Sequence, residues 1–142
     1  MKTLVAIFAL VILITSCGKS PKCWGKDKNE GDISESVKIT CPPMIGDRWV
    51  INNQNTYQQT FDSGCALPTI DFNNYTLLGL EATGGCEAKY IREVEREDDG
   101  TTHYKVTVKS CGTCKKLSVS YNWVTIPKIP DNATVTFEVV KK

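Results

Sequence analysis

Residues Thr102 to Ile126 read T-H-Y-K-V-T-V-K-S-C-G-T-C-K-K-L-S-V-S-Y-N-W-V-T-I, with two alternating runs around Cys111-Gly112-Thr113-Cys114. One face of each run is apolar: Tyr104, Val106 and Val108 in the first, and Leu117, Val119, Tyr121 and Trp123 in the second. A period of two is typical of a β-strand with one buried face, and small residues between two such runs suit a tight connection. The stretch therefore predicts a β-hairpin that supplies much of one side of the core.

Shorter runs on both sides of this stretch indicate further strands. We expect them at residues 37–40, 48–51, 75–82, 86–96 and 133–139, with an extended edge segment at 67–72. The spacing of Ile51, Tyr57 and Phe61 predicts a short helix within 52–61, capped by Asn52 or Asn53. Asp98-Asp99-Gly100 is a hairpin turn signal, because Asp and Gly accept positive φ.

No pattern after Phe61 is long enough for a helical crossover between parallel strands. The sequence therefore predicts a mainly β fold, a small antiparallel sandwich or open barrel with one short helix, stapled by disulfides. We expect a single β-rich domain over residues 37–142.

The N-terminal segment has the features of an export signal. A basic start at Lys2 precedes an apolar run from Leu4 to Ile14, which is shorter than the roughly 20 residues of a spanning helix. Ile14-Thr15-Ser16-Cys17 resembles the lipobox of bacterial lipoproteins. That resemblance implies a signal peptide over residues 1–16 and lipid attachment at Cys17 through acyl chains such as palmitate. Residues 17–36 are then expected to form the lipid anchor and a tether.

Gly18 follows Cys17, at a position where an Asp would resemble the inner-membrane retention signal of some Gram-negative bacteria. The lipoprotein resemblance therefore implies the outer membrane, on its periplasmic face or at the cell surface. Removal of residues 1–16 also removes Lys2, so 16 basic residues balance 16 acidic ones. No basic stripe is present, which argues against a nucleic acid partner. The oligomeric state stays open.

Cysteine usage agrees with export to an oxidising compartment. Of seven cysteines, six remain after Cys17 is assigned to lipid: Cys23, Cys41, Cys65, Cys86, Cys111 and Cys114. An even number predicts up to three disulfides, with 15 possible pairings that the sequence leaves open.

Cys111 and Cys114 also allow an alternative function, that of a thiol–disulfide oxidoreductase. Such a site needs its first cysteine at a helix N-terminus, where backbone N–H groups stabilise the thiolate. The residues from Lys115 to Trp123 alternate as a strand does, which favours a structural disulfide here. The redox alternative stays open because three neighbouring positive charges can lower the pKa of a thiol here, those of Lys109, Lys115 and Lys116.

The sequence gives little support for a zinc site, a hydrolase triad or a carboxylate site. Zinc would need two ligands beyond Cys111 and Cys114, and no second ligand pair is present. His103 is the only histidine and falls on a lysine-rich face, which gives little support to a hydrolase triad. The carboxylates between Glu93 and Asp99 are interleaved with Arg92 and Arg96 and indicate a solvated face. We expect no catalytic residue, metal or cofactor.

Aromatic residues offer the remaining candidates for a binding surface. Trp24, Trp49 and Trp123 are expected in the core, as is usual for tryptophan in a small β domain. The sequence places a possible partner patch around Trp123 and the segment Ile126-Pro127-Lys128-Ile129.

Three segments carry a resemblance to known proteins. They are residues 67–79, beginning Leu67-Pro68-Thr69-Ile70-Asp71-Phe72, then Thr83-Gly84-Gly85-Cys86, and then Asn122-Trp123-Val124-Thr125-Ile126-Pro127-Lys128. With the closing Val135-Thr136-Phe137, their order resembles the C-terminal domain of protease-complex-associated lipoproteins of the PrcB type. The resemblance spans roughly Trp49 to Val140, and its motifs are short and structural. It implies a non-enzymatic, lipid-anchored accessory or inhibitor-like module of an envelope complex.

Overall fold

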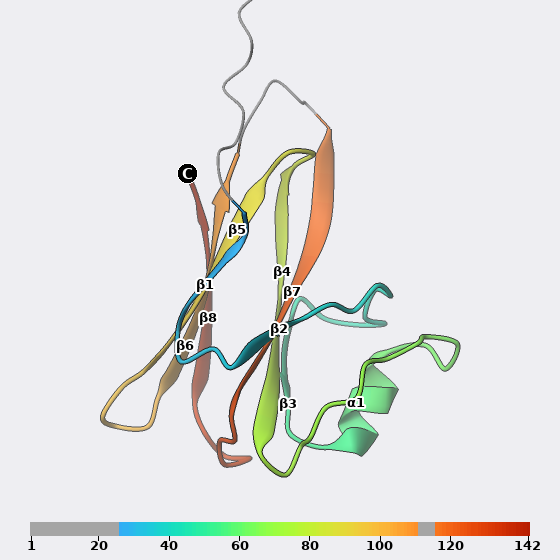
Figure 1. Cartoon of the computed structure of the whole chain (residues 1–142), viewed down its shortest axis with the longest axis vertical. Coiled ribbons are helices and arrows are strands. Elements are labelled where there is room, and N and C mark those ends of the chain that lie inside the picture. Colours follow the sequence, from blue (N-terminus) through green and yellow to red (C-terminus); the bar gives the residue numbers. More distant parts are fainter. Residues whose placement is uncertain (1–25, 111–115) are drawn as a thin grey trace, which may run out of the picture.

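The computed structural model describes residues 26–110 and 116–142, which form two four-stranded β-sheets packed face to face (Figure 1). The first sheet has the order β1 (Lys28–Gly31), β5 (Lys89–Arg96), β6 (Thr102–Lys109), β8 (Val135–Lys141). The second has the order β2 (Glu35–Val37), β7 (Leu117–Pro127), β4 (Tyr75–Gly85), β3 (Arg48–Ile51). The predicted mainly β fold is confirmed, and it is a sandwich. In the first sheet, β1 and β8 pair in parallel with their neighbours.

The predicted hairpin between Thr102 and Ile126 is wrong. β6 pairs with β5 and β8 in the first sheet, whereas β7 pairs with β4 and β2 in the second. The connection after Lys109 therefore passes from one sheet to the other. A period of two reveals which face of a strand is buried, but the choice of pairing partner depends on contacts distant in sequence.

The faces of β7 also differ from the prediction. Asn122, Val124 and Ile126 are buried, and the latter two belong to the core between the sheets, whereas Trp123 is buried on the opposite face. Leu117 and Val119, which were expected in the core, are 71% and 50% exposed. A β-sheet buries side chains only where another layer covers it, and this end of β7 has no such cover among the described residues.

Two separate cores result from this arrangement. The core between the sheets is built mainly from β4, β5, β6 and β7 and includes Leu78, Val94, Val106 and Val124. The second core lies on the other face of the second sheet, where α1 (Gln54–Thr60) packs through Tyr57 against Leu77 and Trp123. β4 contributes to both cores, which confirms its prediction as a central strand covered on both faces.

Local signals near α1 are borne out. Asn53 caps the helix, since its Oδ1 accepts a hydrogen bond of 2.8 Å from the Thr56 N–H. The strand predicted at 48–51 is β3 (Arg48–Ile51). The strand expected at 37–40 is displaced to β2 (Glu35–Val37), and residues 67–72 form no strand.

The turn predicted at Asp98-Asp99-Gly100 is confirmed and joins the antiparallel strands β5 and β6. Gly100 has φ of +87°, a conformation that favours glycine, and Asp99 Oδ1 accepts from the Thr101 N–H at 2.8 Å. The hydrogen bond from the Thr101 N–H lowers the pKa of Asp99.

The described part of the expected tether, residues 26–36, contributes strand residues to both sheets. β1 pairs in parallel with β5, and β2 begins at Glu35. Few side chains of this segment are apolar, so its attachment depends on ladder hydrogen bonds and on Asp27, whose Oδ1 accepts from the Tyr90 N–H at 3.1 Å. Within residues 26–110 and 116–142, no helix has the length and apolar character needed to cross a membrane.

Gly79 provides a test of the second core. A Cβ added there would lie 2.1 Å from the ring of Trp123, the residue directly opposite on β7. We expect Gly79→Ala to lower the free energy of unfolding by about 1–3 kcal/mol, because the buried indole would have to move. Gly64→Ala is the matched control, since its Cβ would meet only the Asp62 carboxylate, at 3.4 Å. Equal urea midpoints for the two variants would contradict this packing.

Candidate functional site

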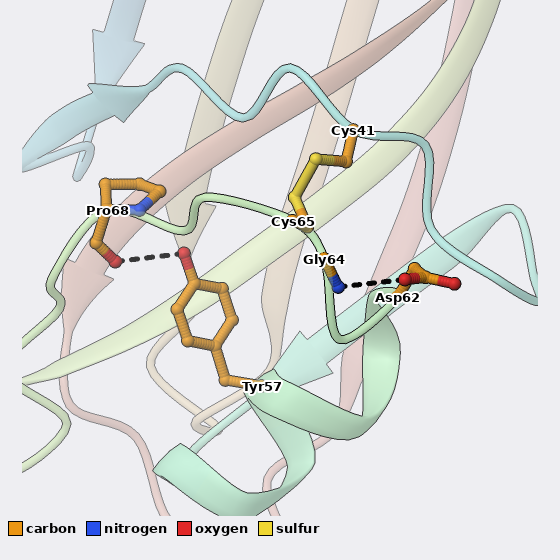
Figure 2. The surroundings of a disulfide bond; sticks show 6 residues. All are labelled: Cys41, Tyr57, Asp62, Gly64, Cys65 and Pro68. Atoms are coloured by element: carbon orange, nitrogen blue, oxygen red, sulfur yellow. Dashed lines mark hydrogen bonds between the residues drawn. A yellow bond between two sulfur atoms is a disulfide. The ribbon is translucent and has the colours of Figure 1, made fainter.

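The cysteine predictions are partly resolved. Cys41 and Cys65 form a disulfide with a Cα–Cα distance of 6.0 Å (Figure 2), and Cys86 is also disulfide-bonded. Cys17, Cys23, Cys111 and Cys114 lie outside the described residues, as does Trp24. Lipid attachment and the chemistry of the C-x-x-C pair therefore stay predictions.

The partner patch expected around Trp123 and residues 126–129 is not a surface feature. Trp123, Ile126 and Ile129 are all buried, and only Pro127 and Lys128 are exposed. The loop folds inward because the Ile129 N–H donates to Thr76 Oγ1 at 3.1 Å. Ile126 faces the core between the sheets.

His103 lies on the outer face of the first sheet, among carboxylates. Its Nε2 is 3.0 Å from Glu97 Oε1, and its Nδ1 contacts Thr136 Oγ1. Lys105 pairs with Glu93 on the same face, and this contact raises the pKa of Lys105. No group of residues in the described ranges has the composition of a metal site. The arrangement is a charged, solvated sheet face, as expected, except that Arg92 belongs to the interior.

The most unusual surface feature is the apolar loop, which we define as residues 41–47, C-P-P-M-I-G-D. Met44 and Ile45 at its tip are 57% and 86% exposed. The loop leads into β3, and Met44 is hydrogen-bonded to Thr60 of α1. Two adjacent apolar side chains directed into water are unusual on a loop and mark a candidate contact surface.

Four features fix the backbone of the apolar loop. Its first residue, Cys41, is tied by the disulfide to Cys65 in the turn after α1. The Met44 N–H donates to the Thr60 carbonyl at 2.9 Å, and the Ile45 carbonyl accepts from Trp49 Nε1 at 2.9 Å. Gly46 has φ of +101°, and its position against the Trp49 ring leaves little room for a side chain.

Trp49, which holds the Ile45 carbonyl, is itself held by an aromatic cluster. Its ring centroid lies 5.0 Å from that of Trp123 and 6.1 Å from that of Tyr121. Phe61, at the end of α1, packs on Trp123 at 5.4 Å. The loop conformation is thus coupled to the second core, and not only to its own hydrogen bonds.

Beside the apolar loop is a hollow of about 710 Å³. Its lining combines the Met44 side chain with the exposed side of α1 and the turn that follows, namely Gln54, Gln58, Phe61, Asp62, Ser63, Cys65 and Leu67. The turn is ordered by hydrogen bonds, including Gly64 N–H to Asp62 Oδ1 at 2.9 Å (Figure 2). The loop and the hollow together form a surface with one apolar projection and one concave side.

Sequence reasoning missed this surface. A signal was present, since Met44-Ile45 stands as an isolated apolar pair between Pro42-Pro43 and Gly46. Such a pair has no strand or helix period, so periodicity cannot distinguish a buried anchor from an exposed one.

The hydroxyl of Tyr57 makes the stability of the fold depend on pH. Burial raises the pKa of Tyr57 from 10.0 to about 12, and its hydroxyl donates to the Pro68 carbonyl at 3.1 Å (Figure 2). Because the folded state holds the phenolic proton more tightly, this stabilisation is complete below pH 10 and is lost as the pH rises toward 12.

We therefore expect the wild-type protein to lose up to about 2 kcal/mol more stability than Tyr57→Phe over that alkaline range, measured by urea unfolding. Tyr75→Phe, which alters a partly exposed ring, is the control. Parallel pH profiles for wild type and Tyr57→Phe would refute the assignment.

Comparison of the chain with protein-family models, curated proteins and solved structures finds no match to any of them.

Proposed function

We propose that this protein is a non-catalytic, lipid-anchored envelope protein that binds a protein partner through the apolar loop. The observation that carries the proposal is a backbone held by a disulfide and two hydrogen bonds that presents two exposed apolar side chains, Met44 and Ile45. The lipid anchor at Cys17 and the accessory role in an envelope complex follow from the sequence resemblances described above.

Preorganisation makes the apolar loop suited to binding. Association normally requires loops and side chains to be ordered at the interface, which lowers the affinity. Here the disulfide, two hydrogen bonds and Gly46 have already ordered the backbone. Burial of each large apolar side chain contributes roughly 1.5–3 kcal/mol, so Met44 and Ile45 together are adequate as anchor residues.

The same contacts limit how a partner could engage the loop. A protease cleft, or the edge of a β-sheet, recognises the free backbone N–H and carbonyl groups of an extended segment. In the apolar loop the Met44 N–H and the Ile45 carbonyl are already bonded to Thr60 and Trp49. This argues for a partner with an apolar pocket that receives side chains. An inhibitor-like action would then occur at a surface outside a substrate cleft.

The redox alternative through Cys111 and Cys114 receives less support. The described chain resumes at Lys116, and β7 begins at Leu117, so no helix follows the pair among the described residues. Helix N-termini are a principal means of lowering a thiol pKa.

Site-specific photo-crosslinking in intact envelopes tests the docking surface. We expect a photoreactive residue at position 45 to give one discrete adduct. That adduct should be lost with Met44→Asp and weakened when Cys41 and Cys65 are both replaced by Ala. Position 117 is the matched control, because Leu117 is also exposed and apolar but lies at the start of β7. No adduct at position 45, or the same adducts at both positions, would exclude the apolar loop as the docking surface.

The anchoring part of the proposal has its own test. Cys17→Ser should move the protein from the membrane pellet to the soluble fraction and remove the acyl mass from its N-terminal peptide, since the acyl chains supply the membrane affinity. Cys23→Ser is the control and should stay in the pellet. A Cys17→Ser variant that still sediments with membranes would contradict lipid attachment at this residue.

A further inference from the structure

A second site lies at the opposite edge of the second sheet, where the interior of the sandwich contains an arginine. Arg92 is on the face of β5 that also carries the buried Tyr90 and Val94, and only 13% of its side chain is exposed. A guanidinium in this position loses much of its hydration, which is unfavourable unless other groups compensate the charge.

Among the described residues, the compensation for the Arg92 charge is incomplete. Arg92 Nε donates to Asn122 Oδ1 at 3.1 Å, and Nη2 donates to Asp27 Oδ2 at 3.2 Å. A guanidinium has five N–H donors, and Nη1 has no acceptor among residues 26–110 and 116–142. Asp27 is 42% exposed, so its carboxylate is a partly solvated partner at the edge of the site.

Asn122 fixes the direction of the guanidinium. Its Nδ2 lies 3.3 Å from the carbonyls of both Leu80 and Ser120, which leaves Oδ1 to accept from Arg92. The Asn122 carbonyl in turn accepts from the Tyr104 hydroxyl at 3.0 Å. These contacts hold Arg92 in one orientation, as a recognition residue requires.

Arg92 lines a solvent-open cleft of about 450 Å³, which is within the range of small-molecule sites. Lys38 adds a second positive charge to the lining, against the single carboxylate of Asp27. Tyr121 and Trp123 also line the cleft, and of these two rings Tyr121 is partly exposed whereas Trp123 is buried. Among the described lining residues, the cleft therefore offers two positive charges against one carboxylate, beside the partly exposed ring of Tyr121.

We propose that this cleft binds a small molecule that carries a carboxylate, which is a binding activity separate from the protein docking described above. The planar guanidinium matches a carboxylate through paired N–H groups, and Nη1 provides donors that no described residue uses. Lys38 contributes charge, and the Tyr121 ring contacts the apolar body of the ligand. Asp27 competes for the same guanidinium.

The test uses benzoate as the probe and benzamide as its neutral counterpart, with two-dimensional ¹⁵N NMR of the mature protein. We expect benzoate to shift the Arg92 Nε and Trp123 Nε1 signals saturably, and benzamide to leave them unchanged. Arg92→Gln should weaken binding by about tenfold or more, because a charge-assisted hydrogen bond is lost. Asp27→Asn should strengthen binding, because the competing carboxylate is removed.

Two further variants keep the result interpretable if Arg92→Gln fails to fold. Lys38→Gln alters an exposed side chain and should weaken benzoate binding by a few-fold. Arg48→Gln is the matched control, since Arg48 is an exposed arginine paired with Asp47 and does not line the cleft. Shifts that grow without saturation, equal responses to benzoate and benzamide, or weaker binding in Asp27→Asn would overturn the proposal.

Discussion

The packing of the Trp123 indole over Gly79 organises much of this molecule. The two residues are directly opposite on β7 and β4, and the absence of a side chain at Gly79 leaves room for the ring. Because the ring lies on the outer face of the second sheet, that face becomes apolar enough to bind α1 through Tyr57 and Phe61. Trp49 stacks on the same indole and holds the carbonyl of Ile45. A central packing contact thus determines the shape of an exposed loop.

The core between the sheets depends on a different kind of contact. Most of it is apolar, but Arg92 of the first sheet bonds to Asn122 of the second, and Tyr104 bonds to the Asn122 backbone. Directional hydrogen bonds in a low-dielectric interior restrict how the two layers can be aligned. Dispersion contacts alone restrict this alignment only weakly. Nη1 of Arg92 has no acceptor among the described residues, so the side chain that aligns the two layers also lines the proposed binding cleft.

The two proposed sites share structural support. Tyr121 lines the Arg92 cleft and contacts Trp49, which anchors the apolar loop. The disulfide between Cys41 and Cys65 spans a sequence separation of 24 residues, and closing a loop of that length stabilises a small domain by about 2–4 kcal/mol. It also links the start of the apolar loop covalently to the turn after α1 (Figure 2).

Local chemistry in the sequence was sufficient for the mainly β class, β3, the capped helix at Asn53, the Asp98-Asp99-Gly100 turn and the buried strand β4. Each of these depends on side chains within a few residues of one another, where period, capping and turn propensity act directly.

Tertiary structure alone decided that β6 and β7 belong to different sheets, that Leu117 and Val119 face water, and that Ile126 and Ile129 are buried. It also brought Arg92 to Asn122 and Trp49 to Ile45, pairs whose hydrogen bonds exist only after the layers have packed. Alternation specifies that a strand has two different faces, but which face meets another layer is set by long-range packing, and the candidate sites of this protein arise from that packing.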